Sequence, residues 1–262
     1  MTHAILYLTC RFAVPALALY LVNPSLSLID TALIGQFDST HLASLAPSTM
    51  LLDYPAYLLT LLGISTQNLV ATELGKNNVD AASEALSDGM SIALGVGFLM
   101  CGLSALLVKP LLEIICSGSS VSLIAPAVQY VNIRSTTWPA VTITSVLQST
   151  LLARGDVINP VKAAWASALV NLVLDWLLIG RYGIAGAAVA TVATQLLVLV
   201  MQARALDLGY RFKRVSAARA QEFVALAGPV GLTNGMKVLL LSLTQLSPPE
   251  NHPDSRSYCR RR

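Results

Sequence analysis

Two long apolar stretches follow each other in PVKAAWASALVNLVLDWLLIGRYGIAGAAVATVATQLLVLVMQA, residues Pro160–Ala203. The first, Pro160–Gly180, is interrupted only by Lys162 near its start and by Asp175 inside it, and the second, Tyr182–Ala203, has no charged residue. The hydrocarbon core of a bilayer is about 30 Å thick, and an α-helix of roughly 20 apolar residues crosses it. The two stretches therefore predict a pair of membrane-spanning helices joined by a short turn.

The composition of the whole chain supports a membrane protein. Of its 262 residues, 55% are hydrophobic and 12% are charged, whereas roughly a quarter are charged in an average soluble domain. This excludes a disordered chain and leaves too few charges to cover a soluble fold. Ser247–Arg262 contributes two of the three net positive charges, so no basic surface for a nucleic acid remains. The four cysteines have neither C-x-x-C nor ligand-spaced histidines, so no metal site or cofactor is expected.

Four further spans precede this pair, which makes the fold class all-α: a polytopic bundle with six spanning helices and part of a seventh. The earlier spans are Phe12–Ile29, continuing through Asp30 to Gly35; Tyr54–Thr72, with helix from near Leu42 and including Asp53; Gly89–Val108; and Ser135–Ala153, entered through Arg134. The seventh begins at Glu222, is interrupted by Lys237 and stops before Ser247.

The chain accordingly divides into four parts. Residues 1–205 form the six-helix lobe, 206–221 a basic linker, 222–246 a partial helix seven and 247–262 a proline-rich tail expected to be disordered. FAVPAL at Phe12–Leu17 is similar to LAGPVGL at Leu226–Leu232, each opening an apolar helix. Helix seven is therefore interpreted as the start of a second repeat that is then cut off.

The basic residues predict the orientation, because Lys and Arg accumulate in cytoplasmic loops. With the N-terminus in the cytoplasm, or in the stroma for a plastid membrane, Lys109 and Arg181 lie in external loops. The internal segments then hold Arg11, Lys76, Arg154, Lys162, Arg204, Arg211, Lys213, Arg214 and Arg219. The arginines of the tail are an exception if helix seven spans the membrane.

Polar side chains recur at helical spacing inside the spans, which predicts a hydrated interior. The stripes are Asn23, Ser27, Asp30 and Thr31; Thr49, Asp53, Thr60 and Gln67; Arg134, Thr137, Ser145 and Gln148; Ser167, Asn171 and Asp175; and Thr191, Thr194, Gln195 and Gln202. Hydroxyls and amides in such helices are often packing contacts, which is the interpretation for Thr60, Thr137, Ser145 and Gln202. Asp53 is either a cavity residue or a structural partner of Arg134.

Asp30 and Asp175 are the best candidates for function, since an intramembrane carboxylate is costly and faces the bundle interior. Such a group can exchange a proton for a cation. Asn171, one turn from Asp175, offers another oxygen, and Thr191 a third if the last two helices of the lobe adjoin. We expect a coupling site for H⁺ or Na⁺, with Asn23, Ser27, Asp53, Ser167 and Gln195 as cavity-lining candidates.

Several segments resemble the multidrug and toxic compound extrusion (MATE) family, in particular its branch similar to DNA-damage-inducible protein F. The segments are LIDTALIGQF at Leu28–Phe37, LASLAPST at Leu42–Thr49, VATELGKNN at Val70–Asn78, LLARGDVINP at Leu151–Pro160 and NLVLDWLLIGRYGIAGAAVAT at Asn171–Thr191. Their order and spacing cover Arg11 to about Leu241.

This resemblance implies two six-helix lobes around a central cavity that opens alternately to each side, with efflux of organic or cationic compounds driven by H⁺ or Na⁺ antiport. The family's coupling residues match Asp30, Asn171 and Asp175, and less closely Thr191. Pro24 corresponds to a proline at which the first helix bends. The partners implied are the lipid bilayer, a small organic substrate and a second lobe or a second chain.

Two other functions compete with transport. A truncated, non-transporting membrane fragment agrees with the tail at Ser247–Arg262, because only one lobe and part of helix seven are present. An intramembrane aspartyl protease also needs two aspartates, but the residues before Asp175 are Leu-Val-Leu rather than G-x-G. No phosphate-binding loop or Ser/His/Asp set is apparent, so the chain is not expected to be an enzyme.

Overall fold

A computed structural model describes most of the helical lobe. It covers residues 31–36, 39–115 and 123–206, with positions 17, 21, 26, 28, 29, 209–212, 215, 216, 219–221, 223, 225, 228 and 236 on either side. Every element in this part is a helix: α2 (Ser39–Gly75), α3 (Val79–Ile115), α4 (Ile124–Ser135), α5 (Trp138–Ala153), α6 (Ile158–Tyr182) and α7 (Ile184–Ala205). The all-α bundle is confirmed.

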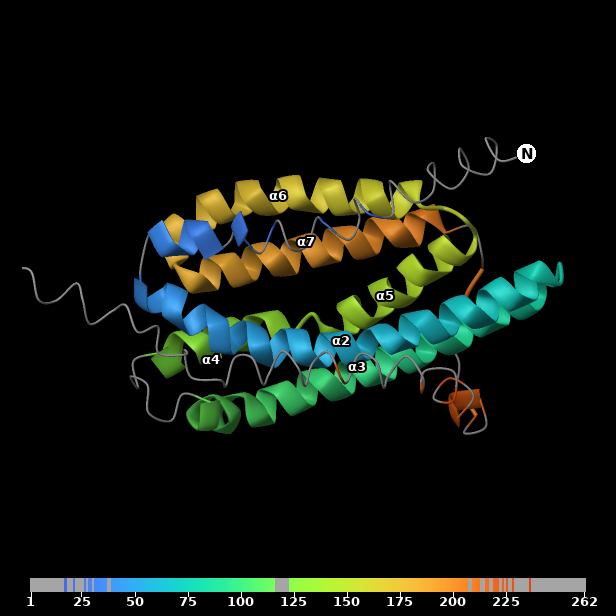
Figure 1. The fold of residues 1–262 in the computed structure, drawn as a ribbon, viewed down its shortest axis with the longest axis horizontal. Helices are drawn as coiled ribbons and strands as arrows, with labels where there is room; N and C mark the ends of the chain where they lie inside the picture. Colours follow the sequence, from blue (N-terminus) through green and yellow to red (C-terminus); the bar gives the residue numbers. More distant parts are fainter. Residues whose placement is uncertain are drawn as a thin grey trace, which may run out of the picture.

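The helices form two antiparallel pairs with a third element between them (Figure 1). α2 packs against α3, and α6 packs along α7. α5 contacts α2, α3 and α7, while α4 contacts the same three helices. The α4–α5 segment therefore joins the two pairs into one lobe.

The fourth predicted span is divided into two helices, which corrects the expectation of one helix entered through Arg134. α4 ends at Ser135 and α5 begins at Trp138. Pro139 lacks the N–H that would bond to the carbonyl of Ser135, four residues earlier, so the helix cannot continue unbroken. Arg134 consequently belongs to α4 and not to the helix that carries Ser145 and Gln148.

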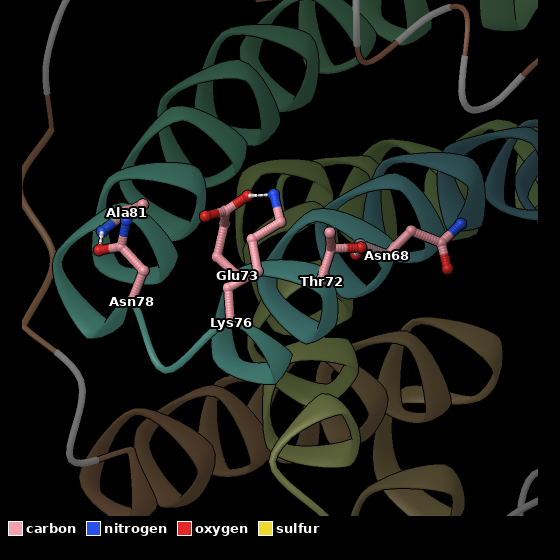
Figure 2. Close-up of polar contacts among 6 residues, drawn as sticks. All are labelled: Asn68, Thr72, Glu73, Lys76, Asn78 and Ala81. Carbon is pink, nitrogen blue, oxygen red and sulfur yellow. Dashed lines mark hydrogen bonds and ion pairs between the residues drawn. The ribbon is translucent and has the colours of Figure 1, made fainter.

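The α2–α3 hairpin is longer than the spans Tyr54–Thr72 and Gly89–Val108 predicted from hydropathy. Both helices have 37 residues, which corresponds to about 55 Å and exceeds the hydrocarbon core. The turn between them is polar: Lys76 Nζ lies 2.6 Å from Glu73 Oε1, and the backbone N–H of Ala81 donates to Asn78 Oδ1 at 3.1 Å (Figure 2). Such contacts suit a turn that lies in water beyond the bilayer.

The distribution of polar residues on α6 is the reverse of that in a soluble protein. Leu169, Val173 and Trp176 are exposed, whereas Asn171 and Asp175 are buried. Within the described residues, α3, α6 and α7 are long and apolar enough to cross a membrane. An apolar exterior around a polar interior is the arrangement that a bilayer requires.

Glycines close the turn between α6 and α7. Gly183 has φ 56° and ψ −135°. Residues that carry a Cβ avoid this backbone conformation. A Cβ on Gly186 would lie 2.5 Å from the carbonyl oxygen of Leu178. The missing side chains thus let α7 fold back directly against α6.

Candidate functional site

The buried face of α6 carries the strongest candidate site. Ser167, Asn171 and Asp175 follow one another at intervals of four residues, which places them on one side of the helix. Their exposed fractions are 9%, 3% and 0%. α6 packs mainly along α7, with a slight contact to α5. The spacing therefore predicted the correct face, and the carboxyl group of Asp175 is completely enclosed by protein.

The polar atoms of this face differ in how they are bonded. Ser167 Oγ donates to the carbonyl oxygen of Ala164 at 2.8 Å. Asn171 Nδ2 is buried and has no hydrogen-bond partner among the described residues. Since buried polar groups are nearly always paired, an unpaired amide suggests a place that a ligand or water completes. Carboxylate and amide oxygens are also the ligands that hard cations prefer.

Thr191 is on the neighbouring helix, as the expected ligand set requires. It is half-buried on α7, and its Oγ1 donates to the carbonyl oxygen of Ala187 at 2.9 Å. A hydroxyl that donates in this way keeps lone pairs with which it accepts a proton donor or binds a cation. The predicted adjacency of the two helices is present, and the coupling role of Thr191 stays a prediction.

Gln195 of α7 contacts Thr137 at the start of α5, and Gln202 contacts α5 itself. The hydroxyl of Thr137 lies 2.5 Å from Gln195 Oε1, and Gln202 Nε2 donates to Gln148 Oε1 at 3.3 Å. These are contacts between helices, as in the packing interpretation of Thr137 and Gln202. Ser145 faces elsewhere, because a Cβ on Gly63 of α2 would lie 2.7 Å from its Oγ. The side chains of the predicted stripe from Arg134 to Gln148 therefore contact different neighbouring helices and do not line one cavity.

Asp53 is exposed on α2 and does not belong to the buried face of α6. Arg134 Nη1 donates to Tyr130 Oη at 3.1 Å, and its guanidinium lies 5.6 Å from the centre of the Tyr130 ring. Both interpretations of Asp53, as a structural partner of Arg134 and as a cavity residue, stay predictions.

The first-helix candidates Asn23, Pro24, Ser27 and Asp30 lie outside the described residues, so their roles stay predictions. The same holds for most of the partial helix seven and for the tail. Within the described part of the chain, no group of three or more His, Cys, Asp or Glu residues is placed to hold a metal ion.

Sequence reasoning missed one buried carboxylate, that of Asp88 on α3. The residue is 2% exposed, and its Oδ2 lies 3.4 Å from Nε of Arg219. The predicted span began at Gly89 and so excluded Asp88 as a charged boundary. Ala85 and Ile92, three residues before and four residues after Asp88 on the same side of the helix, were the available signal.

Comparison with known proteins relates this chain to a family of membrane proteins. The family model MatE matches residues 15–177. The chain is 33% identical over 239 residues to Protein DETOXIFICATION 47, chloroplastic, of Arabidopsis thaliana, a match that covers 88% of this chain and 44% of that protein. It is 32% identical over 205 residues to DNA damage-inducible protein F of Escherichia coli (strain K12), which covers 76% and 44%. The chain thus spans less than half the length of these relatives.

The fold also matches a solved structure. An outward-facing multidrug resistance MATE family transporter of the MOP superfamily superposes with a TM-score of 0.79 at 18% identity. The match covers 91% of this chain and 54% of that one. The arrangement of α2–α7 is therefore that of about half of a known transporter fold.

Proposed function

This chain belongs to the MATE family of multi-pass membrane transporters, and from that premise we propose that it forms the ion-coupling lobe of an antiporter. In this proposal, organic or cationic compounds are exported in exchange for H⁺ or Na⁺ by alternating access. The family assignment supports a transporter rather than an enzyme. Because the chain spans 44% of its relatives, a second lobe or a second chain completes the pathway.

The buried stripe of α6 carries the proposal. Asp175 is fully buried within a helix whose other faces are apolar, and an intramembrane carboxylate at such a place marks an ion or proton path by default. When Asp175 is charged, a cation between its carboxylate and the oxygens of Asn171 and Thr191 neutralises it. When the cation leaves, a proton does the same. The site is neutral in both forms, so the carboxylate of Asp175 is never left uncompensated inside the lobe.

Asp30 is the second carboxylate of the proposed site, and Pro24 the point at which the first helix bends. In the orientation that the basic residues predict, the α2–α3 turn faces the cytoplasm or stroma. Ion release to that side then allows the substrate to bind there, and the substrate-loaded transporter returns. The substrate is a small organic molecule that leaves when the opposite side opens.

The substitution Asp175→Asn tests this function in a complete transporter that carries this lobe. Asparagine keeps the size and the hydrogen bonding of the side chain but cannot titrate. We expect efflux from liposomes under an imposed Na⁺ gradient at constant pH, or under a pH gradient without Na⁺, to fall to the rate of empty liposomes. The gradient that drives the unmodified protein identifies the coupling ion.

A matched control is Glu113→Gln, which removes a carboxylate that is exposed near the end of α3. This variant should transport at the unmodified rate. Both proteins should unfold at the temperature of the unmodified protein, so that lost transport does not reflect lost folding. Gradient-driven efflux by Asp175→Asn at the control rate would reject the coupling role.

A further inference from the structure

Several described residues beyond α7 contact α3 or α2 of the lobe. We call the following described residues the strap: 209–212, 215, 216, 219–221 and 223. In Figure 1, orange segments that follow α7 lie beside the first half of α3. Within the predicted linker 206–221, the described residues Gly209, Arg211 and Arg219 contact the lobe that precedes it.

Two serines of α3 hold the beginning of the strap. Ser83 Oγ donates to the carbonyl oxygen of Gly209, and Ser87 Oγ accepts from the backbone N–H of Arg211 at 3.0 Å. The two serines are one helical turn apart, so they meet consecutive parts of an extended chain. These bonds use the backbone of the strap and do not depend on its side chains.

An ion pair holds the middle of the strap. Asp88 adjoins Ser87 on α3, and the side chain of Arg219 is 40% exposed while that of Asp88 is 3% exposed. Arg219 Nε and Asp88 Oδ2 are 3.4 Å apart, which makes them an ion pair, but their geometry is not that of a hydrogen bond. A buried carboxylate is costly unless a cation compensates it. The charge of Asp88 therefore holds Arg219 near α3, although the Arg219 side chain is partly exposed to water.

The end of the strap is held by a buried aromatic residue. Phe223 is 2% exposed, and its carbonyl oxygen accepts from Ser65 Oγ of α2 at 3.0 Å. Ser65 itself is completely buried. In the sequence, helix seven begins at Glu222, so this contact fixes the first residues of the next helix against the first lobe.

We propose that the strap is a fixed anchor between the lobe and the helix that follows, with the Asp88–Arg219 pair as its main electrostatic contact. The role of the anchor in a transport cycle rests on the proposed transport function, whereas its attachment to the lobe does not. If two bundles rock against each other, the movement then pivots beyond Phe223 and leaves the strap on α3. Removing the ion pair loosens the strap and slows the cycle without altering ion coupling.

Trypsin measures the attachment, because it cleaves after Lys or Arg in chain that has opened and the strap region contains Arg211, Lys213, Arg214 and Arg219. We expect Asp88→Asn to raise the rate of cleavage in this region about tenfold for the full chain in lipid nanodiscs, since proteolysis follows the population of the open form. Asp80→Asn is the matched control, because Asp80 is an exposed carboxylate of the same helix. Equal cleavage of Asp88→Asn and the unmodified chain would overturn the anchor.

A disulfide provides a second measurement that does not depend on how well Asp88→Asn folds. In a chain without its four natural cysteines, Ser87→Cys and Arg211→Cys should cross-link rapidly under mild oxidation, and Asp80→Cys with Arg211→Cys should not. In a complete transporter carrying the lobe, the locked strap should keep at least about half of the transport rate, because the pivot lies beyond it. Failure to cross-link, or transport abolished by the lock and restored by reduction, would reject a fixed anchor.

The two proposals fail in different ways. If Asp175→Asn transports normally while the strap cross-links and resists trypsin, the coupling role is wrong and the anchor stands. If Asp175→Asn abolishes transport while Asp88→Asn leaves cleavage unchanged, the anchor is wrong and the coupling role stands.

Discussion

At the scale of single residues, the interior of this lobe keeps polar groups that packing alone would not select. Asn171 is 3% exposed, and its amide nitrogen lacks a partner among the described residues. An unpaired buried donor costs about 1–3 kcal/mol of desolvation. This donor needs an acceptor such as a water molecule, whereas a cation would bind only the amide oxygen of Asn171.

Asn171→Leu should therefore separate stability from function. Leucine has a similar volume and no donor, so the free energy of unfolding should stay equal or rise by about 1 kcal/mol. Gradient-driven efflux in a complete transporter should be lost, because the oxygen one turn from Asp175 is gone. Thermal unfolding and liposome flux are the measurements, with Asn68→Leu, which replaces an exposed amide on α2, as the control. A clear loss of stability in Asn171→Leu would show that the amide is a structural partner instead.

At the scale of the helices, close crossings are made where glycine removes the side chain. A Cβ on Gly97 of α3 would lie 2.4 Å from the Cα of Pro139 and 2.7 Å from Thr142 Oγ1. The Pro139 atom is backbone and cannot rotate away. Thr142 also bonds across this crossing, donating to the carbonyl oxygen of Ala93 at 2.8 Å.

Gly97→Ala should destabilise the lobe by about 1–3 kcal/mol, because α3 and α5 must separate to admit the methyl group. Gly102→Ala, on the same helix, is the control: nothing lies within 4 Å of its Cβ position. There the change should stabilise the helix by roughly 0.5–1 kcal/mol, since alanine loses less backbone entropy. Unfolding midpoints in detergent compare the two variants. Similar midpoints would mean that the crossing is looser than these distances indicate.

At the scale of the whole molecule, the outer surface is built for lipid. The chain has three tryptophans, and they occupy different environments. Trp165 and Trp176 of α6 are 53% and 71% exposed, whereas Trp138 is 4% exposed and its Nε1–H donates to Ser104 Oγ at 3.0 Å. The exposed pair lies on one apolar side of α6, about a quarter of a turn round the helix from the buried aspartate.

Brominated phospholipids, which quench a tryptophan in contact with their acyl chains, test this surface. In single-tryptophan variants, Trp165 and Trp176 should be strongly quenched and Trp138 should be protected, because an apolar exposed side chain in a spanning helix meets lipid. Quenching of Trp138 equal to that of Trp176 would contradict the packing of α5 against α3. Protection of all three would place the outer face of α6 against protein.

The sequence determined the class of the protein and the face of α6 on which its polar residues lie. Apolar runs of sufficient length can only be buried in lipid as helices, and side chains four residues apart share a side of a helix. Ser167, Asn171 and Asp175 could therefore be grouped on one face from their spacing alone. The family segments add the order of the helices, because their spacing along the chain is preserved.

The tertiary structure decided which residues from different helices meet. It divided the Ser135–Ala153 span at Pro139. Thr137 and Gln148 contact α7, whereas Ser145 lies against α2. Arg219 pairs with Asp88, which is 131 positions earlier in the chain. Periodicity describes one helix at a time, whereas these contacts depend on crossing points set by side chains as small as that of Gly97. A linker rich in charge is read from sequence as solvated chain, and only packing shows that one of its arginines compensates a buried carboxylate.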